Sequence, residues 1–141
     1  MAGGGAGLLL RPLAYLWAGP NTLLGLAFVL PAAATGGRVR VERGAVEVHG
    51  GFVRWFLARG IPAVVPFAGP AAALTLGHVI LGQDRDCLEA SRDHEHVHVR
   101  QYERWGPVML PAYFAGSFLA WRRGLDPYLD NPFEREAYGN S

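Results

Sequence analysis

The chain has 141 residues, which suffices for one domain with a modest core, and Cys87 as its only cysteine excludes an intrachain disulfide. Half of the residues are hydrophobic and only 18% are charged, and the net charge of +1 argues against a nucleic-acid binder. The charge is uneven: up to Gln83 six Arg and two Glu give +4, and from Asp84 onward seven Arg and ten acidic residues give −3.

The first predicted element is an apolar N-terminal segment. No charged side chain occurs from Pro12 to Gly37, a run of about 26 residues that is long enough to cross the hydrocarbon core of a bilayer. Arg38 and Arg40 follow directly, and such a basic flank is typical of the cytoplasmic side of a membrane. We therefore expect residues 1–37 to form a single membrane anchor, with membrane lipid as a partner and the following domain in the cytoplasm.

Two other interpretations of this segment remain. Residues 19–21, Gly-Pro-Asn, interrupt the apolar run, which could instead be a helix buried in the domain. The segment also has the parts of a secretory signal peptide, with an apolar run from Leu23 to Leu30 and small residues from Ala32 to Ala34 at the cleavage site. In that case the mature protein would be exported and would begin near Thr35.

Alternation with period two predicts a β-hairpin after the apolar segment. Valines at positions 39, 41, 46 and 48 alternate with polar residues on either side of Arg43 and Gly44. A second uncharged stretch, from Gly60 to Gln83, would be long enough for a second membrane segment, but its three prolines disfavour a spanning helix. Its last part, Leu74 to Leu81, reads as one buried strand that joins the hairpin.

The other predicted elements are helical. One or two turns are expected over residues 52–59. A long helix is expected from Cys87 to about Arg104, with Asp86 as its N-cap and Gly106 at its end. An apolar helix over residues 108–122 and a short helix that begins after Asn131 complete the chain, and Pro132 suits the first position of the short helix.

The long helix carries three of the five histidines of the chain. Residues four apart lie on the same face of a helix, so His94 and His98 can present ring nitrogens to one metal ion. Glu95 lies about 100° from His94 around the axis, beside the ion, where a carboxylate can accept a proton from a bound water. This HExxH pattern indicates a zinc hydrolase, and the competing interpretation is a charged, solvent-exposed helix without metal.

Two histidines do not complete a zinc site, because zinc in hydrolases usually takes three protein ligands and a water. The HExxHxxGxxH extension is absent, since VRQYE follows His98. The third ligand must come from elsewhere, and the C-terminal NPFEREAY offers Glu134 and Glu136. These two lie about 200° apart around a helix, so only one can face the ion, and Glu134 could instead turn back to cap the helix.

HEHVHVRQYERWG followed by NPFEREAY resembles the HExxH and downstream ExxA motifs of gluzincin-type zinc metallopeptidases, which include the HtpX and CAAX prenyl proteases. The chain resembles still more closely small bacterial membrane proteins with a minimal zincin-like domain. The resemblance covers residues 74–138 and implies a bound zinc ion with Glu134 as the third ligand. Ala137 then matches the alanine of the ExxA motif. Tyr138 stands where an acidic residue often follows that alanine.

The expected fold is α+β, with an N-terminal membrane helix and a zincin-like metal-binding domain over residues 38–141. Its small antiparallel sheet, a hairpin plus one strand, would pack on the HExxH helix, a second apolar helix and a short C-terminal helix. The expected function is a zinc-dependent, membrane-associated metallopeptidase that acts on a peptide or protein, with Glu95 as general base. The alternative is a non-catalytic, zinc-stabilised membrane protein that serves as a structural or partner-binding module.

Further residues have open roles. A peptide could lie extended along Leu74 to Leu81, where His78 is either a core histidine or part of the site. The transition state could be stabilised by one of three tyrosines: Tyr102, Tyr128 or Tyr138. Three aromatic residues could contact a second copy of the chain or a partner membrane protein, although a core role is the more usual one: Trp105, Phe114 and Trp121.

Overall fold

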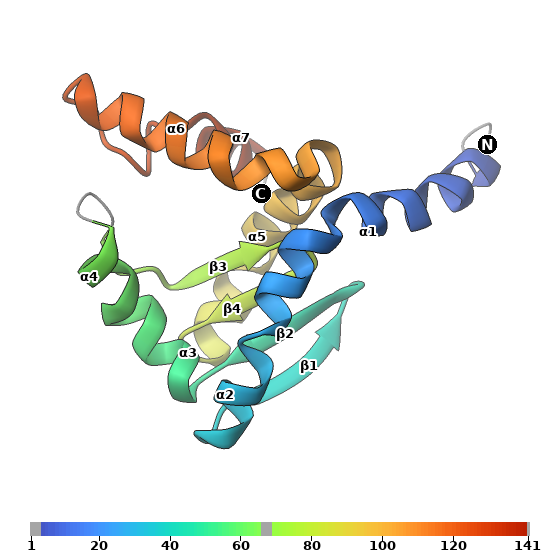
Figure 1. Cartoon of the computed structure of the whole chain (residues 1–141), viewed down its shortest axis with the longest axis horizontal. Helices are drawn as coiled ribbons and strands as arrows, with labels where there is room; N and C mark the ends of the chain where they lie inside the picture. Colours follow the sequence, from blue (N-terminus) through green and yellow to red (C-terminus); the bar gives the residue numbers. More distant parts are fainter. Residues whose placement is uncertain (1–3, 66–68, 141) are drawn as a thin grey trace.

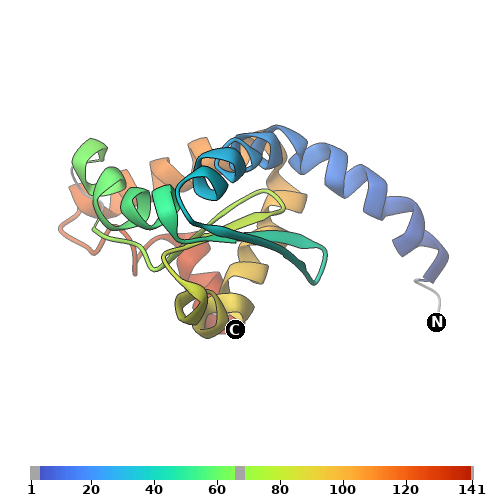
Figure 2. The same ribbon diagram turned by 90° about the horizontal axis from the view of Figure 1, so that it is seen from below.

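The computed structural model describes residues 4–65 and 69–140 and has an α+β fold, as the sequence predicts. A small sheet lies between two layers of helices, with α1 to α4 and α6 on one side and α5 and α7 on the other (Figures 1 and 2). The helices are α1 (Gly4–Leu26), α2 (Val29–Ala34), α3 (Gly51–Trp55), α4 (Ile61–Val64), α5 (Arg85–Trp105), α6 (Met109–Arg122) and α7 (Pro132–Asn140).

The sheet has four strands in the order β1-β2-β4-β3. The strands are β1 (Arg38–Glu42), β2 (Ala45–His49), β3 (Ala73–Leu76) and β4 (Val79–Gly82). The predicted β1–β2 hairpin is confirmed, and it turns at Arg43 and Gly44, which both have positive φ. The antiparallel sheet predicted from the sequence is wrong, because β2 and β4 pair in parallel and the sheet is therefore mixed.

The stretch predicted as one strand, Leu74 to Leu81, is a hairpin of β3 and β4. The turn consists of Gly77 and His78, and Gly77 has a φ of 63°. A Cβ at Gly77 would lie 2.4 Å from Thr22 Oγ1, so both the turn and the contact with α1 require glycine. The single-strand prediction fails because the stretch is apolar throughout, and such a run shows no periodicity that marks a turn.

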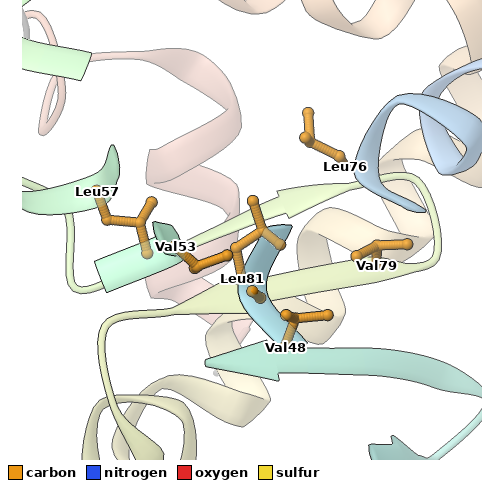
Figure 3. Packing of buried hydrophobic residues seen from close by; sticks show 7 residues of the cluster. Val48, Val53, Leu57, Leu76, Val79 and Leu81 are labelled. Atoms are coloured by element: carbon orange, nitrogen blue, oxygen red, sulfur yellow. The ribbon is translucent and has the colours of Figure 1, made fainter. Parts of the chain in front are cut away.

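Both faces of the sheet are buried at β4, whereas β1 is largely exposed. On the face toward α1, α2 and α3, side chains from the strands, α2, α3 and the following π-helical turn form one apolar cluster (Figure 3). It consists of Ala32, Val48, Val53, Leu57, Leu76, Val79 and Leu81. Because side chains alternate along a strand, Ala45 and Ile80 point to the other face, where they pack with Leu88 and Val99 of α5. The helical turns predicted at residues 52–59 are α3 and a π-helical turn, Phe56–Gly60.

Helix α1 is attached to the rest of the domain along one side. Tyr15 OH donates a hydrogen bond to Gly44 O at 2.7 Å, and Asn21 Nδ2 donates to Gly106 O at 2.8 Å. Arg11–Ala34 is the one stretch in the described part of the chain that is long and apolar enough to cross a bilayer, a test that signal sequences and core helices also pass. Residues 60–83, the other candidate from the sequence, contain α4, β3 and β4.

The ends of α5 are set by its caps. Asp84, not the predicted Asp86, is the N-cap, and its side chain accepts a hydrogen bond from Cys87 N at 2.8 Å. Asp86 lies in the first turn, where its negative charge suits the helix dipole. The predicted end at Gly106 is confirmed: this residue has a φ of 55° and follows the last residue of α5, Trp105. A 3₁₀ turn, Gly106–Val108, then leads into α6.

Helix α7 begins after Asn131, as the sequence predicts. The Asn131 side chain accepts a hydrogen bond from Phe133 N at 2.9 Å and donates to Tyr113 O and Ser117 Oγ of α6, both at 2.8 Å. One buried amide therefore caps α7 and fixes its start against α6. This contact determines where the carboxylates of α7 lie relative to α5.

Candidate metal centre

Helices α5 and α7 bring His94, His98 and Glu134 together. His94 Nε2 lies 2.9 Å and His98 Nε2 lies 2.8 Å from the same oxygen, Glu134 Oε1. The candidate ligand atoms of the three residues all lie within 4.8 Å of one another. The three residues named as ligands from the sequence thus form a possible metal-binding triad.

The donors of this triad suit a divalent metal ion. Ligands at about 2.0 to 2.1 Å from a tetrahedral ion lie about 3.3 to 3.4 Å from each other, and the Nε2 atoms of His94 and His98 are 3.3 Å apart. Two imidazoles and one carboxylate, without a thiolate, are ligands that zinc and other imidazole-binding transition metals accept. The distances from these Nε2 nitrogens to Glu134 Oε1, 2.9 and 2.8 Å, are shorter than this spacing and are those of hydrogen bonds. The types of donor and the spacing of the two histidines therefore fit a zinc ion.

Glu134 supplies the negative charge of the centre. Burial opposes its ionisation, but the hydrogen bonds from His94 and His98 lower the pKa of Glu134 to about 2. Burial also disfavours the charged form of His98 and so lowers its pKa. The hydrogen bond and the charge of Glu134 outweigh burial and raise the pKa of His98 to about 9. Because a metal must displace the proton on His98, metal binding should strengthen as the pH rises toward that value.

Gln101 orients His98 from within the same helix. Gln101 is fully buried, and its Oε1 lies 2.7 Å from His98 Nδ1. Its amide nitrogen donates to Phe133 O at 3.0 Å, so the side chain also joins α5 to α7. No motif in the sequence marks Gln101, although its position three residues after His98 places it one turn further on the same face.

Glu136 has a different environment from Glu134. Its Oε1 accepts a hydrogen bond from Gln101 Nε2 at 2.9 Å and forms an ion pair with Arg104. The hydrogen bond from Gln101, together with Arg104, lowers the pKa of Glu136 despite its partial burial. Glu136 is therefore engaged beside the triad and is not one of the three converging ligands.

Aromatic side chains surround the remaining sides of the triad. Tyr113 OH donates to Glu134 Oε2 at 2.8 Å, and nothing in the sequence around Tyr113 indicated this contact. The Tyr138 ring packs on His94 with centroids 4.4 Å apart, and Tyr138 OH lies 3.2 Å from Tyr128 OH. Of the three tyrosines named from the sequence, Tyr138 thus touches the triad, whereas Tyr102 packs in the core with Ala18 and Met109.

The two histidines differ in the hydrogen bonding of their second ring nitrogen, Nδ1. His98 has Gln101 on its second ring nitrogen, whereas His94 Nδ1 is buried without a hydrogen-bond partner among the described residues. An acidic residue after Ala137 is absent in this chain, and Tyr138 provides packing against His94 but no hydrogen bond to Nδ1. The imidazole of His94 is therefore held by packing rather than by a second polar partner.

Glu95 lies next to the triad and contacts the sheet. Its Oε2 accepts a hydrogen bond from Thr75 Oγ1 of β3 at 2.6 Å. Burial raises the pKa of Glu95, while the charge of His98 and the bond from Thr75 act in the opposite direction. A buried carboxylate with a raised pKa, placed beside the two histidines of a possible metal-binding triad, has the properties of a general base.

Strand β3 is an edge of the sheet and lies against this carboxylate. Gln83 N donates to Ala72 O at 3.0 Å in the register that continues the β3–β4 pairing. In an antiparallel pair every second residue bonds to the partner strand, and Ala72, which bonds to Gln83 directly after β4, is one of them. The main-chain groups of Ala73 and Thr75, at the positions between, therefore point away from β4 to the outer edge of the sheet. His78 is not part of this edge: it lies in the turn, stacked on Tyr15 with ring centroids 3.7 Å apart.

No protein-family model, curated protein or solved structure matches this chain. A function must therefore be inferred from the arrangement of its own residues.

We expect Gln101→Leu to lower the zinc affinity by about 10- to 100-fold, the usual effect of removing a group that orients a metal ligand. The leucine has a similar size but leaves His98 Nδ1 without its partner. Gln83→Leu is the matched control, because that glutamine bonds to Ala71 O outside the triad. The measurement is a zinc titration against a chromophoric chelator, and equal affinities in the two variants would remove this role from Gln101.

Proposed function

We propose that this protein is a zinc-dependent, membrane-associated metallopeptidase. The proposal is carried by one observation: a buried carboxylate, Glu95, lies between the His94, His98 and Glu134 triad and an edge strand. The triad would hold zinc, which when bound supplies Lewis-acid polarisation of a carbonyl and a water of lowered pKa. Glu95 has no place among the ligands, and a purely structural zinc site needs no base beside it.

In the proposed reaction Glu95 accepts a proton from the attacking water and delivers it to the leaving amine. Thr75 holds one oxygen of the Glu95 carboxylate, so the other oxygen is the one that exchanges the proton. The substrate, a peptide or an unfolded protein segment, lies extended along β3 and pairs with the outward main-chain groups of the partly exposed Ala73. Tyr138, which packs on His94, is the tyrosine best placed to stabilise the oxyanion.

The second candidate function is a zinc-stabilised module that binds a partner without turnover. It is favoured by the burial of all three ligands, since structural metal sites are closed whereas catalytic sites keep one position open. The unpartnered nitrogen of His94 favours it as well, because catalytic zinc histidines almost always have a second polar partner. Glu95 at this position favours the peptidase.

The association with membranes is proposed from the apolar N-terminal helix. The sequence predicts one span with the domain in the cytoplasm, and a peptidase so placed would act on proteins at or near the membrane. Export after signal cleavage near Thr35 would instead remove α1 and α2, and with them Ala18 and Ala32, which are both fully buried in the domain.

The proposal is tested by cleavage of casein with the full-length protein in detergent micelles. We expect activity that disappears after chelation and returns on addition of zinc but not of magnesium, because magnesium does not suit two imidazole ligands. Zinc binding without any cleavage of casein or of a peptide library would favour the non-catalytic module instead.

A further inference from the structure

Helix α1 has two opposite sides of different character. Its inner side packs on the domain through Tyr15, Ala18, Asn21, Thr22 and Gly25. About 180° around the axis, its outer side exposes large apolar side chains, and Leu16 is 74% exposed. The exposed leucines of this side are Leu13, Leu16, Leu23 and Leu24.

Helix α6 is arranged in the same way. Its inner side is buried at Ser117 and Ala120, and Gly116 closely approaches Pro132 at the start of α7. Its outer side exposes Phe114 and Phe118. Figure 1 shows α1 in front of the sheet and α6 in front of α7, so the outer sides of both helices point toward the same face of the molecule.

The charged residues that flank these two apolar helical segments in the sequence are arginines. Residues 12–37 and 106–121 contain no charged side chain, and the charged residues that directly border these two segments on their outer ends are arginines. These arginines are all exposed, and they are Arg11, Arg38, Arg122 and Arg123. Exposed apolar side chains on segments that are flanked by exposed arginines suit the interface of a bilayer that contains anionic lipid.

The tryptophans add an independent observation. All four are 44–54% exposed, whereas tryptophan is on average a highly buried residue. Trp17 lies on α1, Trp55 on α3 and Trp121 on α6, which are helices on this side of the sheet. A tryptophan that is half exposed has the amphipathic character of residues that sit at the boundary between lipid and water.

The polar contacts of α1 determine whether this helix can span a bilayer or must lie in its plane. Tyr15, Asn21 and Thr22 are hydrogen-bonded to main-chain groups of Gly44, Gly106 and His78, in the middle of the apolar run. A span through this run would either break these bonds or draw charged residues next to them, such as Glu103 and Arg104, into hydrocarbon. The folded domain can keep its bonds only if α1 lies along the bilayer.

We propose that the outer sides of α1 and α6 form a docking surface for a bilayer containing anionic phospholipid, with α1 in the plane of the interface. This differs from the single span predicted from the sequence. It does not depend on the proposed peptidase activity. The domain then rests on one leaflet, with α5 and α7 on the side of the sheet that faces away from the lipid.

The test is flotation of the full-length protein with phosphatidylcholine vesicles, with and without phosphatidylglycerol. We expect binding that is stronger with the anionic lipid and falls about tenfold or more in the double variant Leu16→Glu/Phe118→Glu. Ala90→Glu adds one negative charge at an exposed position of α5, on the opposite side of the sheet, and should bind like the wild type. Leu16→Glu alone adds the same single charge and should already weaken binding. Unchanged binding of the double variant, with its zinc affinity intact, would overturn the proposal.

A second measurement distinguishes an α1 that lies in the plane of the interface from an α1 that spans the bilayer. Peptide tags are attached to both ends of the chain, the protein is added to sealed vesicles, and a protease is applied from outside. We expect both tags to be digested, whereas protection of the N-terminal tag alone would show a span. Dimerisation in the absence of lipid that is abolished by the double variant would identify the surface as an interface between two copies and would also overturn the proposal.

Discussion

Glu134→Ala is expected to lower the zinc affinity by orders of magnitude, whereas Glu136→Ala should leave the metal in place. Glu134 Oε1 contacts both histidine Nε2 atoms and supplies the charge of the triad. Glu136 instead bonds to Gln101 and Arg104. Removing a ligand also removes the folding free energy that metal binding contributes, so Glu134→Ala should loosen α7, a helix of nine residues that is too short to be stable alone.

Both variants are to be compared in parallel zinc titrations with a competing chelator, and hydrogen exchange of α7 reports its stability. Glu136→Ala is the matched control, since it removes a carboxylate of the same helix and an ion pair with it. Loss of zinc in Glu136→Ala together with retention in Glu134→Ala would assign the ligand role to Glu136.

Glu95→Gln is expected to keep the zinc ion but to lower hydrolysis by about 10²- to 10⁴-fold, the usual contribution of a general base. The amide has nearly the shape of the carboxylate, and its oxygen can still accept the hydrogen bond from Thr75 Oγ1. It cannot accept the proton of the attacking water. The expected signature is therefore an unchanged zinc content with a large fall in kcat.

Glu89→Gln is the control for this variant, because Glu89 is a half-exposed residue of the same helix that pairs with Arg85. Its turnover should equal that of the wild type. Turnover of Glu95→Gln within a factor of about two of the wild type would exclude Glu95 as the base.

Without a resemblance to known proteins, the candidate site could be predicted only where its residues are close in sequence. His94 and His98 were recognised because a helix places residues four apart on one face. Glu134 lies 36 residues beyond His98, and the sequence offered Glu136 as an equal candidate until the resemblance to metallopeptidases separated them. The contacts of Thr75 and Tyr113 could not be predicted, because they depend on how β3 and α6 pack against α5 and α7.

The fold was predictable to a similar extent. The β1–β2 hairpin was recognised because β1 is largely exposed and its valines alternate with charged residues. The β3–β4 hairpin was missed because all residues of β4 are buried, which removes the alternation that marks a strand and its turn. The parallel pairing of β2 with β4 joins segments about 30 residues apart, and no local pattern specifies it.

The most direct test of the proposed zinc centre is the metal content of the purified full-length protein after reconstitution with zinc at neutral pH. Inductively coupled plasma mass spectrometry should find about one zinc per chain, and the double variant His94→Ala/His98→Ala should retain almost none. A zinc content near zero in the wild-type protein would contradict the assignment of His94, His98 and Glu134 as a metal centre, and with it the proposed peptidase.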